Sequence, residues 1–407
     1  MKLFRLALPL IVSSMGAQVL NIIATPLLTS FYTAEQFGIW AFFLAITSVT
    51  IAGSAFRYDI SIVLPTSQVK SFMLSIISFQ HVIVTTLVTL IFTMLYFFMS
   101  NSVNVIYLLI PLSVFLGGLG LISNANLNTK KKYKVIATSK FIQTFLTVTL
   151  NLFFVLLNDS DNGGLYLIIS TIAGQGVCLC IQLKSLKVNY YLLFNSLSKK
   201  YRVNLAKKYS DFAIYSLPEV LLGTFLRSFP IYILAYLFTT TEVGQYSLAQ
   251  RLLLLPMAII ATSMSQVYLK SFSLKAAKKE SILKDLIYIW LGSFTLGLVP
   301  AFIVFFYVEP IFLFVFDKSW LMASEIIKWL VFPTLIRFVF TMGSSSHAVL
   351  RMQNYSFYFS VIALLGKLLC ALCFNNTVIE LLVSFAIVDI IVMFIMNYLV
   401  LIRAKRK

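Results

Sequence analysis

Long apolar stretches alternate with short polar segments along the whole chain. A helix needs about 20 apolar residues to cross roughly 30 Å of hydrocarbon, and each stretch has about that length or more. The strands of a membrane barrel would instead alternate polar and apolar residues over about ten positions, and no such alternation occurs. The pattern predicts an all-α integral membrane protein with about 12 transmembrane helices. The predicted spans are residues 6–30, 37–64, 71–99, 104–126, 135–157, 164–183, 211–238, 245–269, 285–308, 326–349, 356–374 and 379–402.

A local repeat divides these spans into two sets of six. The turn around Gly38 matches the turn around Gly244 at an offset of 206 residues, which is about half the chain, and this offset places Trp40 on Tyr246. Because six is even, both sets enter the membrane from the same side, so the repeats are parallel. We expect two pseudo-symmetric six-helix lobes around a central cavity. The expected boundaries are residues 1–183 for the N-terminal lobe, 184–210 for a basic cytoplasmic connector and 211–407 for the C-terminal lobe.

Composition and charge support the membrane interpretation. The chain is 60% hydrophobic and 11% charged, whereas soluble domains have about 45–50% and 25%. The net charge of +18 comes from Lys and Arg in the short polar segments, so it reports topology and not nucleic-acid binding. If the N-terminus is cytoplasmic, almost all loop Lys and Arg lie inside, and Lys318 is the exception. The positive-inside rule then places both termini in the cytoplasm.

Motifs for catalysis, metal binding or cofactor binding are not found in the sequence. The four cysteines lie within or at the edges of apolar spans without neighbouring His or Cys pairs, which is typical of small buried side chains. Gly-rich phosphate loops, HExxH and paired carboxylates on a polar domain are likewise lacking. We therefore expect a transporter with no catalytic residues, no metal and no cofactor.

Polar and charged side chains inside the spans are the candidate functional residues, because such groups usually face a bundle interior or a watery cavity. In the first span, Gln18 and Asn21 share a helix face, and the offset of 206 places Asn21 on Arg227 of the seventh span. Glu219 lies two turns before Arg227 on the same face. The candidate substrate-binding residues are Arg227, Arg337, Lys367, Lys140, Arg251, Arg57, Gln18, Asn21 and Asn151, and the candidate ion-coupling residues are Asp59, Glu219 and Asp389.

Cations outnumber anions among these residues, and a hydrated cleft lined by Arg and Lys attracts an anion such as phosphate or pyrophosphate. Less specific interpretations stay open for several of them. Arg57 and Asp59, placed near the end of the second span, also fit a local structural pair at the interface. Lys140 and Arg251 lie close enough to span ends to extend their charges into the headgroup region.

Three separated segments resemble the Wzx-type polysaccharide flippases. They are Arg57 to Pro65 (RYDISIVLP), Asn128 to Gln143 (NTKKKYKVIATSKFIQ) and Ser216 to Pro256, which begins SLPEVLLGTFLRSFP. These flippases belong to the polysaccharide transporter family of the multidrug/oligosaccharidyl-lipid/polysaccharide exporter superfamily. The resemblance implies functional positions at Arg57 to Asp59, at Arg227 and at Tyr246 to Arg251. It also implies a bacterial cytoplasmic (inner) membrane protein that moves an undecaprenyl-pyrophosphate-linked oligosaccharide of O-antigen or capsular type to the outer leaflet.

Transport by alternating access is the function expected from these observations, with a proton or sodium gradient as a candidate energy source. The expected partners are the lipid-linked oligosaccharide, the bilayer, and the polymerase and chain-length regulator of the same pathway. One alternative is a cation-coupled multidrug exporter of the same superfamily, although its cavity should be acidic and aromatic. Another is a membrane polysaccharide polymerase, which would be expected to need a larger outside loop than Glu309 to Glu325, of about 17 residues.

Overall fold

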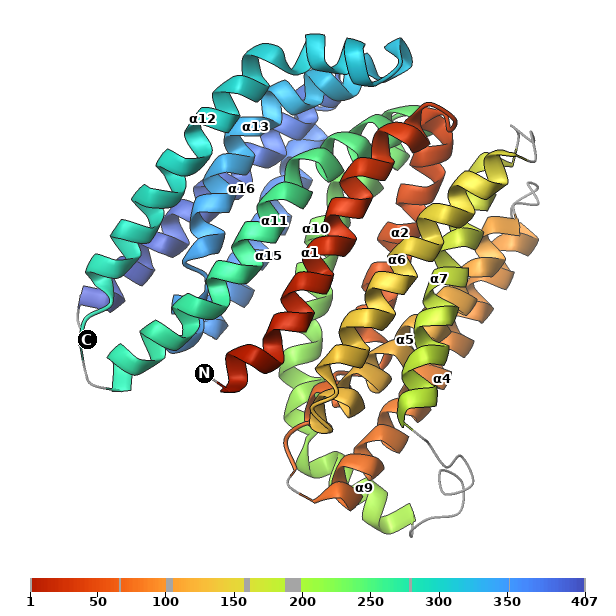
Figure 1. Ribbon diagram of the computed structural model, residues 1–407, viewed down its shortest axis with the longest axis vertical. Helices are drawn as coiled ribbons and strands as arrows, with labels where there is room; N and C mark the ends of the chain where they lie inside the picture. Colours follow the sequence, from red (N-terminus) through yellow and green to blue (C-terminus); the bar gives the residue numbers. More distant parts are fainter. Residues whose placement is uncertain are drawn as a thin grey trace. The chain divides into compact units, whose positions relative to one another are not determined.

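The computed structural model describes residues 2–65, 67–99, 105–156, 162–186, 199–277, 280–350 and 352–405. Within these residues every regular element is a helix (Figure 1). Each of the twelve predicted spans coincides with one long helix, so the predicted fold class is confirmed. These helices are α1 (Lys2–Thr29), α2 (Ala34–Ser54), α4 (Gln68–Met99), α5 (Leu109–Thr129), α6 (Tyr133–Val155), α7 (Gly163–Leu186), α10 (Leu217–Leu237), α11 (Thr240–Ala277), α12 (Leu283–Val315), α13 (Leu321–Met342), α15 (Gln353–Cys373) and α16 (Val378–Lys405).

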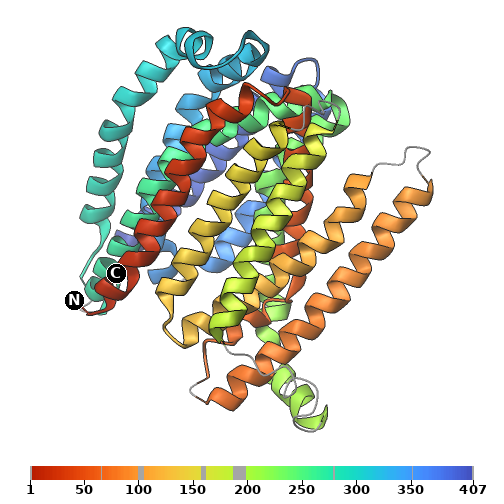
Figure 2. The same ribbon diagram turned by 45° about the vertical axis from the view of Figure 1, so that its right-hand side comes forward.

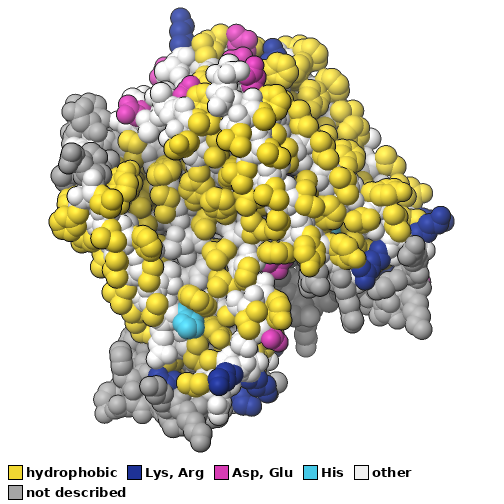
Figure 3. All heavy atoms as spheres, turned by 180° about the vertical axis from the view of Figure 1, so that it is seen from behind, with side chains coloured by type: hydrophobic (Ala, Val, Ile, Leu, Met, Phe, Trp, Pro, Cys, Tyr) yellow, Lys and Arg dark blue, Asp and Glu magenta, His cyan; other side chains and the backbone are white. Residues whose placement is uncertain are grey.

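Nine helices of the described residues are long and apolar enough to cross a membrane. Their outward faces carry large hydrophobic side chains, such as Phe92 on α4, which is 69% exposed, and Phe314 on α12, which is 92% exposed. Figure 3 shows one face of the molecule, and hydrophobic side chains cover most of it. In water such a surface would be costly, whereas in a bilayer it contacts lipid chains. The protein is therefore a multi-pass membrane protein.

The second span is shorter than the sequence predicts. Helix α2 ends at Ser54, and Phe56 and Arg57 then adopt left-handed backbone conformations with φ of 48° and 62°. A short helix, α3 (Tyr58–Ser61), follows. The expectation that Arg57 and Asp59 lie inside the second span is thus wrong, because the left-handed residues end the helix before either is reached.

The chain forms two compact units. Unit 1 comprises residues 1–24 and 40–228, and unit 2 comprises residues 25–39 and 229–407. Helices α1, α2 and α10 each contribute to both units. The lobe boundaries expected from the sequence at 184–210 stay a prediction, as does a central cavity. Most of that connector, residues 187–198, lies outside the described part of the chain.

In unit 1, α6 packs against α7, and α4 packs against α5 (Figures 1 and 2). The short basic helix α9 (Lys199–Lys208) packs against α4. Leu205 of α9 joins a buried apolar cluster with Ile62, Met73 and Leu74, and the hydroxyl of Tyr58 donates to the carbonyl of Ala206 at 3.2 Å. These contacts attach the described end of the connector to unit 1.

Two matching capping boxes begin α2 and α11. Thr33 and Gln36 exchange hydrogen bonds between side chain and backbone at 3.0 and 3.3 Å, and Thr239 and Glu242 do the same at 2.7 and 3.4 Å. A capping box of this kind satisfies amide groups that would otherwise lack partners at a helix start. The two boxes are offset by the same 206 residues as the sequence match, so the local repeat is confirmed at the level of hydrogen bonds.

The starts of α2 and α11 cross in unit 2 at two glycines. A Cβ atom on Gly38 would overlap the carbonyl oxygen of Thr240, and a Cβ atom on Gly244 would overlap the carbonyl oxygen of Ala34. Each helix therefore presents its glycine to the first turn of the other. Small residues allow this close approach of two helix backbones.

A tryptophan holds the connection between α12 and α13 against this crossing. Trp320 lies in the short 3₁₀ helix η3 (Lys318–Trp320) and is 1% exposed. Its indole nitrogen donates to the carbonyl of Thr29 at 3.1 Å, and its ring meets Phe37 edge to face at 5.2 Å. Residues 25–39 are thus integrated into unit 2.

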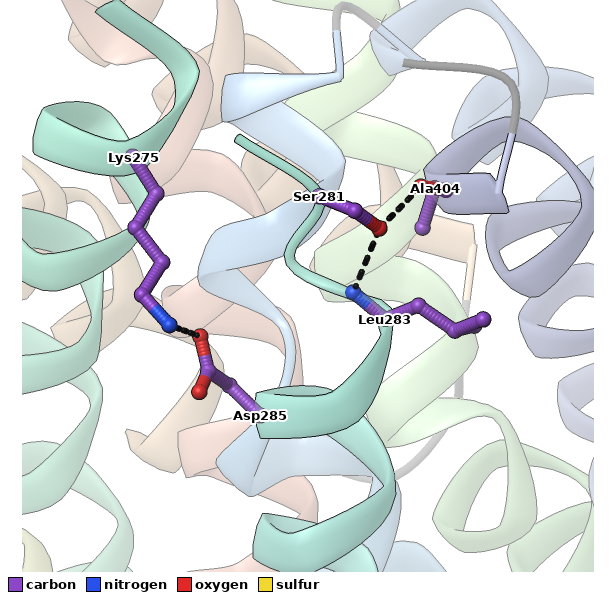
Figure 4. A network of polar contacts seen from close by, with 5 residues as sticks. All are labelled: Lys275, Ser281, Leu283, Asp285 and Ala404. Carbon is purple, nitrogen blue, oxygen red and sulfur yellow. Dashed lines mark hydrogen bonds and ion pairs between the residues drawn. The ribbon is translucent and has the colours of Figure 1, made fainter. Parts of the chain in front are cut away.

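At the opposite ends of these helices, polar contacts tie α11, α12 and α16 together (Figure 4). Lys275 of α11 forms an ion pair with Asp285 of α12 at 2.5 Å. The Ser281 hydroxyl accepts a hydrogen bond from the Leu283 amide at the start of α12 and donates to the Ala404 carbonyl in the last turn of α16. The start of α12 is therefore fixed to the end of α16 through Ser281.

Candidate functional site

Unit 2 contains a small cavity between α10, α11, α13, α15 and α16, with charged and polar side chains on part of an otherwise apolar wall. Its volume is about 80 Å³, which is room for a few water molecules at about 30 Å³ each but not for a sugar. Leucine, phenylalanine, proline and other apolar side chains make up the remainder of the wall. The polar lining residues are Tyr246, Gln250, Thr334, Arg337, Lys367 and Asp389.

Lys367 and Asp389 form an ion pair across this cavity. The ammonium nitrogen of Lys367 lies 2.8 Å from Oδ1 and 2.9 Å from Oδ2 of Asp389, so it bridges both carboxylate oxygens. The Lys367 side chain is 5% exposed and that of Asp389 is 36% exposed. A charge buried this deeply needs a counter-ion because desolvation strongly disfavours an isolated ion. Asp389 supplies that counter-ion from the neighbouring helix.

Arg337 is the second cation of the cavity. It projects from α13 and is half-buried, and it forms no ion pair with another described residue. Tyr246 of α11 lies within electrostatic range of both Arg337 and Asp389. With two cations and one carboxylate, the wall carries a net positive charge. A guanidinium without a protein counter-ion in a low-dielectric setting can bind an anionic group such as a phosphate.

Tyr246, Gln250 and Thr334 were not among the residues chosen from the sequence as candidates from charge or polarity. Tyr246 entered through the local repeat and the family-like block, and Gln250 lies within that block, one helical turn after Tyr246 on the same face. That spacing is a signal that could have identified Gln250. The Lys367–Asp389 pair has no such signal, because its partners lie on different helices.

The other candidate residues do not line this cavity. Arg251 of α11 interacts with neighbouring groups but is not part of the wall. In unit 1, Lys140, Glu219 and Arg227 are exposed. Gln18 and Asn21 are half-buried on α1, and Asn151 is buried on α6 at 1% exposure. A role for these residues in substrate binding or ion coupling stays a prediction.

Arg57 and Asp59 occupy a connection of unit 1. The Arg57 side chain donates to the hydroxyl of Ser216 at 3.4 Å. Asp59 is 7% exposed, and its Oδ1 atom has no hydrogen-bond partner. The two side chains do not form an ion pair, although the charge of Arg57 acts on Asp59. Burial raises the pKa of the Asp59 carboxyl, while Arg57 and two backbone amides oppose this rise.

The buried Asp59 predicts a pH-dependent effect of Asp59→Asn on stability. Because its pKa is raised on folding, the native state binds more protons than the unfolded state. Stability is therefore lost as the pH rises from about 4, the ordinary carboxyl pKa, through the raised value. We expect Asp59→Asn to be more stable than the wild type at pH 7 to 8, with the difference shrinking toward pH 4. Thermal unfolding in detergent across this range measures it.

The matched control is Asp211→Asn, at an exposed carboxyl of the same unit. It should show no comparable trend with pH. A constant difference between Asp59→Asn and the wild type from pH 4 to 8 would contradict the argument from burial.

Comparison with solved structures shows what the fold is similar to. MurJ, a lipid II flippase in an inward closed conformation, superposes with a TM-score of 0.76 at 15% identity, covering 95% of this chain and 86% of MurJ. An inward-facing multidrug resistance MATE family transporter of the MOP superfamily gives 0.65 at 12% identity, covering 96% and 95%. A MOP superfamily transporter from Pyrococcus furiosus gives 0.59 at 11% identity, covering 98% and 95%. The fold is that of MOP-superfamily transporters.

The sequence comparison is more specific. The model of the family described as polysaccharide biosynthesis protein matches residues 27–325, which is well over half of the chain. The chain belongs to this family of polysaccharide biosynthesis proteins. No curated protein matches it in sequence. The chain is thus a member of the polysaccharide biosynthesis protein family with the fold seen in MOP-superfamily transporters.

Proposed function

We propose that the protein flips an undecaprenyl-pyrophosphate-linked oligosaccharide repeat unit, of O-antigen or capsular type, from the cytoplasmic to the outer leaflet of a bacterial inner membrane. The observation that carries the proposal is Arg337, a cation without an ion-pair partner among the described residues, beside the buried Lys367–Asp389 pair. The family match and the likeness to a lipid II flippase support a lipid-linked substrate. The net charge of +18 and the positive-inside rule support cytoplasmic termini.

The physical task of such a flippase is to move a charged headgroup past hydrocarbon. An isolated pyrophosphate in hydrocarbon would cost tens of kcal/mol in lost hydration. A pathway lined by cations and polar side chains removes most of that cost, and the polyprenyl chain stays in lipid. In this proposal Arg337 is the first contact for the pyrophosphate in unit 2, because Lys367 is already neutralised by Asp389.

Lys367 joins the anion site when the substrate or a proton displaces its contact with Asp389. In unit 1, Arg227, Lys140 and Arg57 supply further positive charge, as Arg251 does in unit 2. Gln18, Asn21 and Asn151 offer hydrogen bonds to sugar hydroxyls. Asp389, Asp59 and Glu219 are the proposed carriers of a coupling proton or sodium ion, and a polymerase and a chain-length regulator are the proposed partners.

Replacing Arg337 tests the anion site. A hydrogen bond to a charged group contributes about 1.5–3 kcal/mol, so Arg337→Ala should weaken substrate binding by about ten- to a hundredfold. Arg337→Lys keeps the charge but loses the bidentate hydrogen bonding of the guanidinium, so we expect intermediate activity. The measurement is surface polysaccharide in a deletion strain that carries each variant at equal protein level.

Lys328→Gln provides the matched control, since it removes an exposed cation from the same helix, and it should behave like the wild type. Equal surface polysaccharide in Arg337→Ala and the wild type would exclude the proposed role of Arg337. The transport function itself is tested by the leaflet that holds the lipid-linked repeat unit in the deletion strain. Accumulation on the cytoplasmic face supports a flippase, whereas accumulation on the outer face would favour a polymerase.

A further inference from the structure

Asp389 supplies the carboxylate of the small cavity in unit 2, and it lies deep within a membrane-spanning helix. It follows Val378, the first residue of α16, by 11 residues. At 1.5 Å per residue this is about 17 Å, or roughly half of the 30 Å of hydrocarbon in a bilayer. Lipid headgroups do not reach this depth. The carboxylate therefore needs a cation either from the protein or from solution.

The ammonium group of Lys367 occupies the position at which a free cation would bind this carboxylate. Its nitrogen lies 2.8 Å from Oδ1 and 2.9 Å from Oδ2 of Asp389. A sodium ion bound by Asp389 would also lie against these oxygens, because hard cations bind through oxygen ligands. The two positions overlap, so Lys367 and a free cation compete for the same carboxylate.

Displacing Lys367 from Asp389 would leave a charge with little contact with water. The Lys367 side chain is 5% exposed, and among the described residues the cavity wall offers it no second carboxylate. Arg337 lies in the same wall and adds a further positive charge. Depriving a buried charge of its partner is costly enough to weaken the binding of a competing cation by about a hundredfold or more. The tethered ammonium should therefore win this competition.

Removing the lysine would leave ligands for a cation in the wall. Asp389 would remain, and Tyr246, Gln250 and Thr334 each carry a neutral oxygen atom. The cavity of about 80 Å³ would also gain the space of the lost side chain. A carboxylate with neutral oxygens and room for water is a suitable environment for a hard cation. Lys367 is thus the group that prevents this cavity from being a cation site.

We propose that Lys367 is a built-in cation that keeps sodium out of the cavity for as long as its ammonium group pairs with Asp389. Lys367 thereby determines the ion specificity of the site. One consequence rests on the proposed flippase function. A sodium ion reaches Asp389 only after an anionic headgroup has taken over the ammonium group, so anion binding precedes cation uptake at this site.

Thermal unfolding of the purified protein in detergent tests the exclusion of sodium. Sodium chloride is compared with choline chloride at equal concentration, because choline is too large for the cavity. We expect sodium to leave the melting temperatures of the wild type and of Arg337→Gln unchanged. Lys367→Ala combined with Arg337→Gln removes both cations of the wall, so that Arg337 cannot take the place of Lys367. In this double variant sodium should raise the melting temperature by about 2 °C.

Adding Asp389→Asn to the double variant should remove the effect of sodium, because the carboxylate is then lost. Arg337→Gln alone is the matched control, since it differs from the double variant only at Lys367. An equal rise in Arg337→Gln and in the double variant would overturn the proposal, because sodium would then bind in spite of the lysine. The absence of any rise in the double variant would also overturn it, because the lysine would not be filling a cation site.

A separate measurement distinguishes a failure of this inference from a failure of the proposed function. Undecaprenyl pyrophosphate is added to the wild type, and the comparison of sodium with choline is repeated. If the pyrophosphate takes over the ammonium group of Lys367, sodium should now raise the melting temperature. If it does not, while the variants respond as expected, the exclusion of sodium by Lys367 is supported and the binding of pyrophosphate at Lys367 is excluded.

Discussion

Replacing Gly38 or Gly244 with alanine is expected to abolish the folded protein or to lower its thermal stability severely. At each position the added methyl group would overlap a backbone carbonyl oxygen of the crossing helix. Backbone atoms cannot rotate away as a side chain can, so α2 and α11 would have to separate along their first turns. That separation would also disturb Trp320, whose ring packs on Phe37 one residue before Gly38. We expect a loss of about 3 kcal/mol or more, at the upper end of overpacking effects.

The measurement is thermal unfolding by size-exclusion chromatography in detergent, with Gly292→Ala as the control. Gly292 is a helical glycine of the same unit whose added Cβ atom would meet nothing within 4 Å. Alanine is favoured over glycine inside a helix by about 1 kcal/mol, so Gly292→Ala should stabilise slightly. The two substitutions are chemically identical and should shift stability in opposite directions. A wild-type melting temperature for Gly38→Ala would show that the helices do not cross this closely.

Breaking the Lys367–Asp389 pair should have unequal effects depending on which partner is removed. Asp389→Asn leaves the ammonium group of Lys367 buried without its counter-ion, and removing one partner of a buried pair typically costs 3–5 kcal/mol. Lys367→Met leaves Asp389, whose side chain is 36% exposed and can be hydrated, so we expect a loss of about 1 kcal/mol. Replacing both by Met and Leu should restore most of the stability, because a neutral packed pair has no charge to desolvate.

The Lys275–Asp285 pair, in which both side chains are partly exposed, is the matched control for this comparison (Figure 4). Its side chains are 36% and 31% exposed, so Asp285→Asn should cost at most about 1 kcal/mol. Unfolding by heat or denaturant in detergent compares all four variants. If Asp389→Asn were no more damaging than Asp285→Asn, Lys367 could not be buried as the structure describes. The neutral double variant also separates stability from function, since it should fold but lack the contribution of Lys367 to the proposed anion site.

Hydropathy alone located all twelve long helices, because the length of an apolar stretch is set by the bilayer and not by contacts along the chain. The hydropathy pattern placed the end of α2 too late, at residue 64 instead of Ser54. Residues 60–64 are mostly apolar and lengthen the apolar stretch. Hydropathy depends on residue type, so it cannot show the left-handed backbone at Phe56 and Arg57 that ends the helix. The local repeat was also visible in the sequence, from the matching turns around Gly38 and Gly244, and the capping boxes of Thr33 and Thr239 agree with it. The sequence could not show that Gly38 and Gly244 lie against each other's helices, because aligning two repeats says nothing about whether they are in contact.

The candidate site was predictable only in part. Charge within apolar spans identified Arg337, Lys367 and Asp389, and these residues do line one cavity. No acidic residue lies one helical turn from Lys367 in the sequence, so local spacing indicates no partner for it. Its partner is Asp389, 22 residues later on the adjacent helix. Such a pair depends on the rotation of two packed helices about their axes, which local spacing does not determine. For the same reason, the sequence could not show that Lys140 and Arg227 are exposed within unit 1.

The two compact units do not follow the order in which the chain is made. Residues 25–39 are synthesised early but belong to unit 2, and residues 199–228 follow the connector but belong to unit 1. Each half of the chain therefore contributes a segment to the unit that is formed mainly by the other half. Unit 1 cannot be completed until residue 228 has left the ribosome, and the start of α2 must wait for α11 before Gly38 finds its partner. Separately expressed halves would each lack a piece, and the last insertion steps of biosynthesis, not the first, would commit the chain to its fold.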